Sequence, residues 1–264
     1  MSVPPVSPPP LPGIWEFEAP ADWSAIDFIS DLHLSEATPK TFDAWAGHLR
    51  RTSASAVFML GDIFEVWVGD DSRHAGFEAQ CAEVMAEASS RLTLTFMHGN
   101  RDFLVGAELL RSTGVIALSD PTVLIAFGER LLLSHGDALC LDDHDYQRFR
   151  SMVRTPQWQR DFLARPLDER RAEARRMRLA SEQRKASQRP ADWVDVDKAA
   201  AVRWMHEASA PTLIHGHTHR PQHQDLAPGF VREVLSDWDL DDARSPRAEV
   251  LRLRGGGLLR QAPA

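Results

Sequence analysis

Short apolar runs alternate with amphipathic stretches over most of this chain. Five apolar runs predict strands, at residues 25–29, 56–60, 92–97, 131–134 and 212–214. Three segments predict helices, at residues 39–51, 77–91 and 109–114. Residues 231–235 and 248–259 favour strands. Strands that alternate with helices in this way indicate a layered α/β fold.

The segment from residue 142 to residue 208 differs from the rest because no part of it has a convincing strand pattern. Between Arg148 and Arg189 it contains thirteen Lys or Arg residues against five Asp or Glu residues. Its apolar residues, such as Phe149, Met152 and Trp158, recur at spacings near three and four. These features predict a basic, amphipathic helical insertion. It is either a solvated lid or a cap that faces an anionic, partly apolar ligand.

Composition narrows the class of protein. The 264-residue chain has a net charge of −8, which argues against a nucleic-acid partner because phosphate contacts need a surplus of Lys and Arg. Two cysteines do not make a disulfide framework, so a reducing cytoplasm is expected. The proline-rich start lacks the features of a secretory signal, and residues 1–23 are expected to form an extended arm. No apolar run is long enough to cross a bilayer.

Polar clusters follow five of the predicted strands directly. The candidates among them are Asp31, His33, Asp62, Asn100, Arg101, His135, His217 and His219. Each of them alone has a structural explanation as a helix cap, a turn residue or a packed histidine. Together they fall where ligands bind in α/β folds, at the carboxyl ends of strands, so one shared site is the better explanation.

The spacing inside two clusters points to metal binding. Asp31 and His33 are two residues apart, as are His217 and His219. In an extended backbone, such pairs project to the same side and offer two ligand atoms to one place. Carboxylate and imidazole together suit Mn, Fe, Zn or Co.

The blocks D-L-H (31–33), G-D (61–62), G-N-R-D (99–102), H-G-D (135–137) and G-H-T-H (216–219) resemble the calcineurin-like metallophosphoesterases. The resemblance covers residues 26–221 and implies a four-layer αββα sandwich of two mixed sheets flanked by helices. It implies two divalent metal ions, with Mn²⁺ expected. One ion would be held by Asp31, His33, Asp62 and His219. The other would be held by Asp62, Asn100, His135 and His217, with Asp62 bridging.

One position departs from the family pattern. Where the family usually has histidine after the asparagine, this chain has Arg101. Arginine cannot donate a proton at neutral pH, but its planar fork suits phosphate oxygens. Arg101 therefore joins the seven ligands as a catalytic candidate. Asp102 is expected to orient Arg101 or His135.

Longer blocks at residues 61–71 and 135–150 resemble one branch of this family, the UDP-2,3-diacylglucosamine pyrophosphohydrolases of lipid A biosynthesis. This resemblance implies hydrolysis of a lipid-linked UDP-sugar to UMP and 2,3-diacylglucosamine 1-phosphate. The implied substrate contacts are Asn100, Arg101, Asp143, Ser181, Lys185, Gln188 and His217. Because such a lipid lies in a bilayer, weak docking on the anionic cytoplasmic face of the inner membrane is expected, and a monomer is the simplest expectation. The core would comprise residues 24–141 and 209–264, with residues 142–208 as the lid.

Two other functions remain open. The chain could be another phosphodiesterase or phosphatase of the same superfamily, acting on nucleotides or phosphoproteins. It could also be a non-catalytic scaffold, although such relatives are expected to lose metal ligands and this chain retains all seven.

Overall fold

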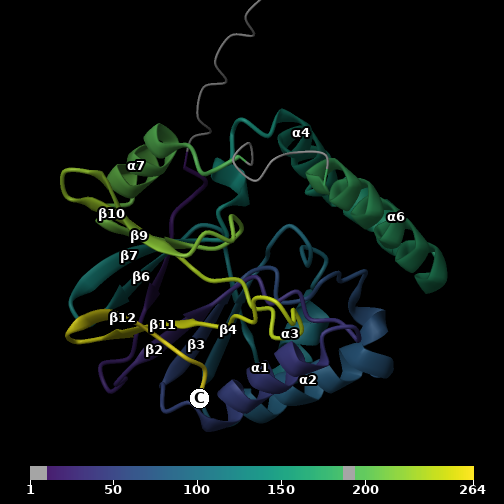
Figure 1. Ribbon diagram of the computed structural model, residues 1–264, viewed down its shortest axis with the longest axis horizontal. Helices are drawn as coiled ribbons and strands as arrows, with labels where there is room; N and C mark the ends of the chain where they lie inside the picture. The colour runs from purple at the N-terminus through teal and green to yellow at the C-terminus, as the bar shows by residue number, and fades with distance from the viewer. Residues whose placement is uncertain (1–10, 187–193) are drawn as a thin grey trace, which may run out of the picture.

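The computed structural model describes residues 11–186 and 194–264, which contain two six-stranded mixed sheets (Figure 1). The first sheet has the order β12-β11-β2-β3-β4-β5. Its strands are β2 (Ile26–Ile29), β3 (Ala56–Leu60), β4 (Thr93–Met97), β5 (Ile116–Leu118), β11 (Val250–Arg254) and β12 (Gly257–Gln261). Strands β2 to β5 are parallel, so their carboxyl ends lie at one edge.

The second sheet has the order β1-β6-β7-β8-β10-β9. Its strands are β1 (Trp15–Glu18), β6 (Thr122–Ala126), β7 (Glu129–Ser134), β8 (Thr212–His215), β9 (Gln222–Ala227) and β10 (Phe230–Val234). β7 and β8 are parallel and end together. Residues 15–18 of the expected N-terminal arm therefore belong to this sheet, where they pair with β6.

The two sheets pack face to face because their strands alternate between two apolar environments. In β3, Phe58 and Leu60 lie between the sheets, whereas Val57 and Met59 face the helices. Helices cover the outer faces: α1 (Pro39–Arg51), α2 (Gly76–Ser89) and α3 (Ala107–Thr113) on the first sheet, and α7 (Lys198–Glu207) on the second. Figure 1 shows α7 and the pair α1 and α2 on opposite sides of the sheets. The predicted αββα sandwich is confirmed.

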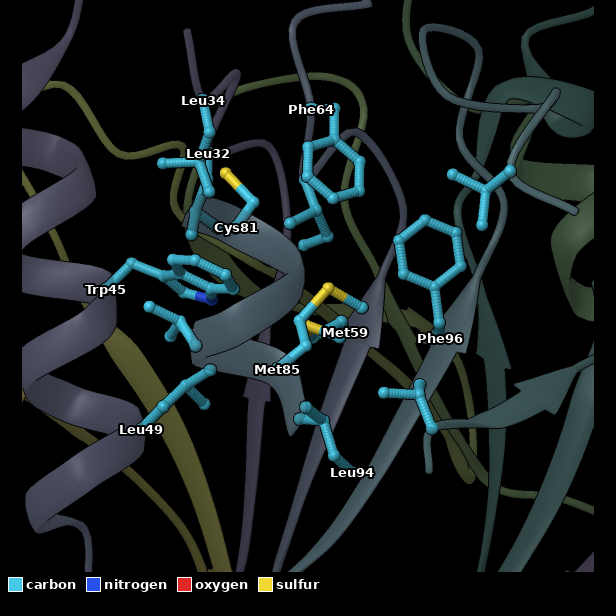
Figure 2. Close-up of a cluster of buried hydrophobic side chains, with 14 of the residues drawn as sticks. Leu32, Leu34, Trp45, Leu49, Met59, Phe64, Cys81, Met85, Leu94 and Phe96 are labelled. Carbon is cyan, nitrogen blue, oxygen red and sulfur yellow. The ribbon is translucent and has the colours of Figure 1, made fainter. Parts of the chain in front are cut away.

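Large side chains fill the space between the first sheet and its helices (Figure 2). Trp45 and Leu49 of α1, Met85 of α2, and Met59 and Phe96 of the sheet belong to one cluster, and all five are buried. Burying one such side chain contributes roughly 1.5–3 kcal/mol. This packing makes the strand ends, and the loops that leave them, a rigid platform.

The segment expected to form a lid contains the helices α4 (His144–Val153), α5 (Pro156–Leu163) and α6 (Leu167–Ala186), and these three helices are called the lid below. α7 also lies within the expected insertion of residues 142–208, but it packs on the second sheet as part of the sandwich. Arg170 of α6 anchors the lid because its guanidinium is buried and donates to Asp71 Oδ1 at 2.9 Å. No helix in the described part of the chain is both long enough and apolar enough to cross a membrane.

Candidate metal centre and lid cavity

The loops that follow β2, β3 and β8 carry most of the ligand candidates, and their backbones are strained. Five candidates have φ angles between 50° and 67°: Asp31, His33, Asp62, His217 and His219. Non-glycine residues seldom adopt this left-handed region, which costs on the order of 1–3 kcal/mol and is concentrated at functional sites. The expectation of extended backbone at Asp31/His33 and His217/His219 is therefore wrong. Left-handed turns direct these side chains to one place.

Asp31, His33 and His219 form the first group of ligand atoms. The Nε2 atoms of His33 and His219 are 3.3 Å apart, and Nε2 of His219 is 3.3 Å from Oδ1 of Asp31. Among the described residues, no donor with hydrogen-bond geometry reaches this buried Oδ1 atom. A carboxylate and two imidazoles that converge in this way fit a divalent cation.

Asp62, Asn100, His135 and His217 form a second, adjoining group. Nε2 of His135 is 3.1 Å from Oδ1 of Asn100 and 3.7 Å from Oδ1 of Asp62. Nδ1 of His217 is 2.7 Å from the same Asn100 oxygen. Ligand atoms of Asp31, Asp62 and His135 lie within 4.8 Å of one another, so the two groups meet at Asp31. The structure thus brings all seven predicted ligands together, while the bridging role of Asp62 stays a prediction.

Outer contacts decide which ring nitrogen faces each group. Nδ1 of His33 is 3.4 Å from the Glu65 carboxylate, and Nδ1 of His219 is 3.5 Å from the Asp237 carboxylate. Nδ1 of His135 is 2.9 Å from the carbonyl oxygen of Leu60. In each case the second nitrogen, Nε2, points to the other ligand candidates. Such partners orient metal-binding histidines and raise their basicity.

Glu65 and Asp237 were not among the residues predicted from the sequence, although each carried a signal. Glu65 stands in the 61–71 block that supported the family resemblance. Asp237 follows the predicted strand at residues 231–235, the same placement that revealed the other clusters. Arg247 holds Asp237, with its Nε donating to Oδ2 at 2.9 Å.

Two glycines allow the loops to approach the ligands. A Cβ atom on Gly99 would lie 2.1 Å from Oδ1 of Asp62, and one on Gly216 would lie 2.2 Å from Oδ2 of Asp31. Both distances are far below van der Waals contact. A side chain at either position would displace a candidate ligand, so glycine is required there.

Several buried ionisable side chains lie close together in the candidate metal centre, and they shift one another's pKa values. Burial raises the pKa of Asp62 to about 7 despite the attraction of His135, and the charge of Asp102 adds to the rise. Burial lowers the pKa of His135, but the carboxylates of Asp62 and Asp31 outweigh it and raise that pKa to about 9. Burial opposes ionisation of Asp31, yet His219 and nearby imidazoles hold its pKa well below the ordinary range. Divalent cations bound among these carboxylates would relieve their mutual repulsion.

Asp102 takes neither of the two expected orienting roles, whereas phosphate contact by Arg101 stays a prediction and its observed contacts are additional to it. The backbone N–H of Arg101 donates to Oδ1 of Asp62 at 2.8 Å, while its guanidinium donates to Glu65 at 3.0 Å. Asp102 contacts neither the Arg101 guanidinium nor a ring nitrogen of His135 by hydrogen bond in the described residues. Instead its carboxylate accepts N–H bonds from Gly99 and Ile63, both at 2.8 Å. It therefore ties the loop after β4 to the loop after β3.

A cavity of about 530 Å³ opens beside Asn100 and Arg101 and is roofed by the lid. Its polar lining lies at Glu65, Asn100, Arg101, Asp145, Tyr146 and Arg178. The rest of its lining is apolar: Val66, Trp67, Val68, Phe103, Leu104, Phe149, Trp158, Phe162, Ala174 and Met177. Its size is typical of small-molecule sites, and its lining suits a ligand with one charged end and a long apolar part.

Four residues of the expected insertion were predicted to contact substrate. Asp143 caps α4, where its side chain accepts the N–H of Tyr146 at 3.0 Å, and it does not line the cavity. Ser181 and Lys185 fall in the last part of α6, and Gln188 lies outside the described residues. Substrate contact by these residues stays a prediction.

Comparisons with known proteins identify relatives of this chain. The family model described as calcineurin-like phosphoesterase matches residues 24–221. A relative from Chromobacterium violaceum, named UDP-2,3-diacylglucosamine hydrolase, is 44% identical over 89% of this chain and 97% of its own length. A relative of the same name from Bordetella pertussis is 43% identical over 87% of this chain and 91% of its own. A solved archaeal phosphodiesterase, 10% identical, has a TM-score of 0.45 and covers 90% of this chain and 98% of its own.

The family resemblance seen in the five sequence blocks is thereby confirmed. Divalent-metal binding is a property of this fold family, and the two ligand groups described above are the residues of this chain that fit it. This protein belongs to the calcineurin-like phosphoesterase family, and its relatives in that family include proteins named UDP-2,3-diacylglucosamine hydrolase.

Proposed function

We propose that this protein hydrolyses the pyrophosphate bond of UDP-2,3-diacylglucosamine in lipid A biosynthesis. Water adds to the uridine-linked phosphorus, and the bond from that phosphorus to the bridging oxygen breaks. The products are UMP and 2,3-diacylglucosamine 1-phosphate. The name shared by relatives that are 44% and 43% identical over most of both chains supports this substrate.

The observation that carries the proposal is the position of the lid cavity. It has its polar end at Asn100 and Arg101, directly beside the metal-ligand candidates, and its apolar lining extends beneath α4, α5 and α6. A pyrophosphate at the polar end leaves acyl chains facing Trp158, Phe162 and Met177. A nucleotide or a phosphoprotein would leave this apolar surface uncovered, which disfavours those substrates.

The side chains of this protein divide the work of the reaction. When bound, two divalent ions, with Mn²⁺ expected, lower the pKa of water and neutralise charge on phosphoryl oxygens. Asp31, His33, Asp62 and His219 would hold one ion, and Asp62, Asn100, His135 and His217 the other. Arg101 lines the cavity, where its guanidinium can donate two parallel hydrogen bonds to phosphate oxygens. The lid excludes water from the acyl chains.

The proposal includes weak docking on the cytoplasmic face of the inner membrane, because the substrate is a lipid. Two apolar residues of the lid are exposed, Met152 by 50% and Leu163 by 40%, and the nearby Arg148 is also exposed. Apolar side chains next to cationic ones suit an anionic bilayer. Sedimentation with phosphatidylglycerol vesicles tests this. Binding should fall as the salt concentration rises, and it should fall further when Met152 and Leu163 are both changed to Glu. Equal binding by this double variant would exclude this surface of the lid as the docking surface.

Substrate preference tests the assignment. The Mn²⁺-loaded protein should have a far higher kcat/KM for UDP-2,3-diacylglucosamine than for bis-p-nitrophenyl phosphate. The small diester shares the phosphorus chemistry but has nothing to occupy the lid cavity. A preference for the small diester would refute the lipid substrate while leaving the metal centre intact.

A further inference from the structure

Glu65 occupies a position between the metal-ligand candidates and the lid. It lies in the loop that follows β3, and it is buried, with 7% of its surface exposed. One carboxylate oxygen is 3.4 Å from Nδ1 of His33. The other is 3.0 Å from a guanidinium nitrogen of Arg101 and 2.8 Å from one of Arg178. One side chain therefore contacts a metal ligand, a phosphate-binding candidate and the lid helix α6.

The contact with His33 orients its ring. With Nδ1 held at the carboxylate, Nε2 points toward Nε2 of His219, 3.3 Å away, where the first group of ligand atoms converges. His33 also has a strained backbone, with φ of 50°. An outer partner of this kind fixes the orientation of a metal-binding imidazole and adds basicity to Nε2.

The contact with Arg178 extends the same connection to the lid. Arg178 lies on α6, more than one hundred residues along the chain from Glu65. Two other anchors of the lid reach elsewhere: Arg170 donates to Asp71, and Arg154 donates to the carbonyl oxygen of Gly99 at 2.7 Å. Glu65 thus joins α6 to a metal-binding histidine through a single carboxylate.

We propose that Glu65 is a positioning residue that couples metal binding at His33 to the position of the lid helix α6. Metal binding fixes the His33 ring, the ring fixes the Glu65 carboxylate, and the carboxylate holds Arg178. Coupling between two sites is reciprocal, so an ordered lid should also favour the bound metal. The inference rests on the proposed metal centre but not on the identity of the substrate.

Asp237 provides a matched comparison on the other side of the same ligand group. Its carboxylate contacts Nδ1 of His219 at 3.5 Å, much as Glu65 contacts His33. It also accepts a hydrogen bond from Arg247, which lies between β10 and β11 and outside the lid. Asp237→Asn therefore removes the charge behind one metal ligand without touching α6.

The test measures Mn²⁺ binding and lid order separately, both without substrate. Electron paramagnetic resonance of free Mn²⁺ gives the affinity, and hydrogen exchange of residues 167–179 reports on α6. In the unaltered protein, Mn²⁺ should slow exchange in α6. Glu65→Gln and Asp237→Asn should each weaken Mn²⁺ binding by about tenfold or more. At saturating Mn²⁺, the response of α6 should be lost in Glu65→Gln and preserved in Asp237→Asn.

A third variant, Arg178→Gln, removes the lid end of the connection. It should weaken Mn²⁺ binding only by the factor that the ordered lid contributes, which is smaller than the loss in Glu65→Gln because His33 retains Glu65, while α6 no longer responds to the metal. Unchanged Mn²⁺ affinity in Glu65→Gln, or an intact response of α6 in that variant, overturns the inference while leaving the proposed function in place. If the unaltered protein binds no Mn²⁺, the metal centre and the coupling fail together.

Discussion

The lid cavity predicts a large and pH-dependent effect of placing a carboxylate at Met177. This residue of α6 lines the apolar part of the cavity. Leu179 lies two residues further along the same helix, outside the cavity lining, and is 56% exposed. Met177→Glu and Leu179→Glu therefore make the same chemical change in the same helix, but only the first puts it where the acyl chains are proposed to lie.

The magnitude follows from the protonation cost of the new side chain in Met177→Glu. An acyl chain in the cavity would remove water from the introduced carboxylate, which escapes the cost of dehydration by taking up a proton. For an ordinary glutamate pKa of about 4.3, protonation at about pH 7.5 costs about 4 kcal/mol, which corresponds to about a thousandfold. Because the side chain can also turn partly toward solvent, we expect kcat/KM to fall by about one hundred- to one thousandfold.

The assay compares both variants with the parent on a diacylated UDP-sugar with chains short enough to remain dispersed in water. Leu179→Glu should change kcat/KM by less than about threefold, since its carboxylate stays hydrated. The loss in Met177→Glu should shrink by about tenfold for each pH unit toward acid, because protonation then costs about 1.4 kcal/mol less. Hydrolysis of bis-p-nitrophenyl phosphate should be unaffected in both. Equal losses in the two variants, or a loss in Met177→Glu that does not change with pH, would refute the cavity as the acyl site.

Two further predictions concern the core and the glycines. Asp27 is buried, and its carboxylate accepts hydrogen bonds from Nε of Arg252 at 2.6 Å and from Thr52 at 2.6 Å. Burial opposes its ionisation, but Arg252, His48 and Thr52 lower its pKa to about 2. The ionised carboxylate therefore contributes about 2 kcal/mol to the free energy of unfolding above pH 4, and this contribution is lost as the pH falls toward 2. Asp27→Asn should lower the free energy of unfolding, measured in urea, by about 3 kcal/mol at pH 7 and by clearly less at pH 3. The same loss at both pH values would contradict a stabilising role of the ionised Asp27 carboxylate. Gly99→Ala should lose most of the bound Mn²⁺ and reduce activity by about a hundredfold or more, because its Cβ would lie 2.1 Å from Asp62 Oδ1. Gly255→Ala is the control and should retain both metal and activity, because nothing lies within 4 Å of its Cβ. Metal analysis that finds full Mn²⁺ in Gly99→Ala would count against the geometry of the metal centre.

Much of the fold was predictable because local patterns agreed with the final packing. The strand at residues 56–60 and the helix at residues 39–51 have the predicted bounds. The strand is a continuous apolar run that is buried on both faces, and the helix has apolar residues at helical spacing on the one face that is buried. Strands β1, β5, β6 and β9 were not predicted. β9 shows why: it is an edge strand with the polar sequence QHQDLA and buries little. Pairing with β10, rather than its own pattern, makes it a strand.

The metal ligands were predictable from their place after strands, but the way they converge was not. The left-handed backbone at Asp31, His33 and Asp62 depends on loops that bond to one another, as in the bond from His33 N–H to the carbonyl oxygen of Asp62 at 3.0 Å. Contacts such as Glu65 with Arg178 join residues that are distant in sequence, and no local pattern specifies them. The same holds for which face of the amphipathic lid covers the cavity.

Isotope labelling tests the central claim most directly. The Mn²⁺-loaded protein is incubated with UDP-2,3-diacylglucosamine in water enriched in ¹⁸O, and the masses of both products are measured by mass spectrometry. The account predicts equal amounts of UMP and 2,3-diacylglucosamine 1-phosphate, with the label in the phosphate of UMP and with product formation abolished in Asp62→Ala. Label in the sugar phosphate, or undiminished product from Asp62→Ala, would contradict it.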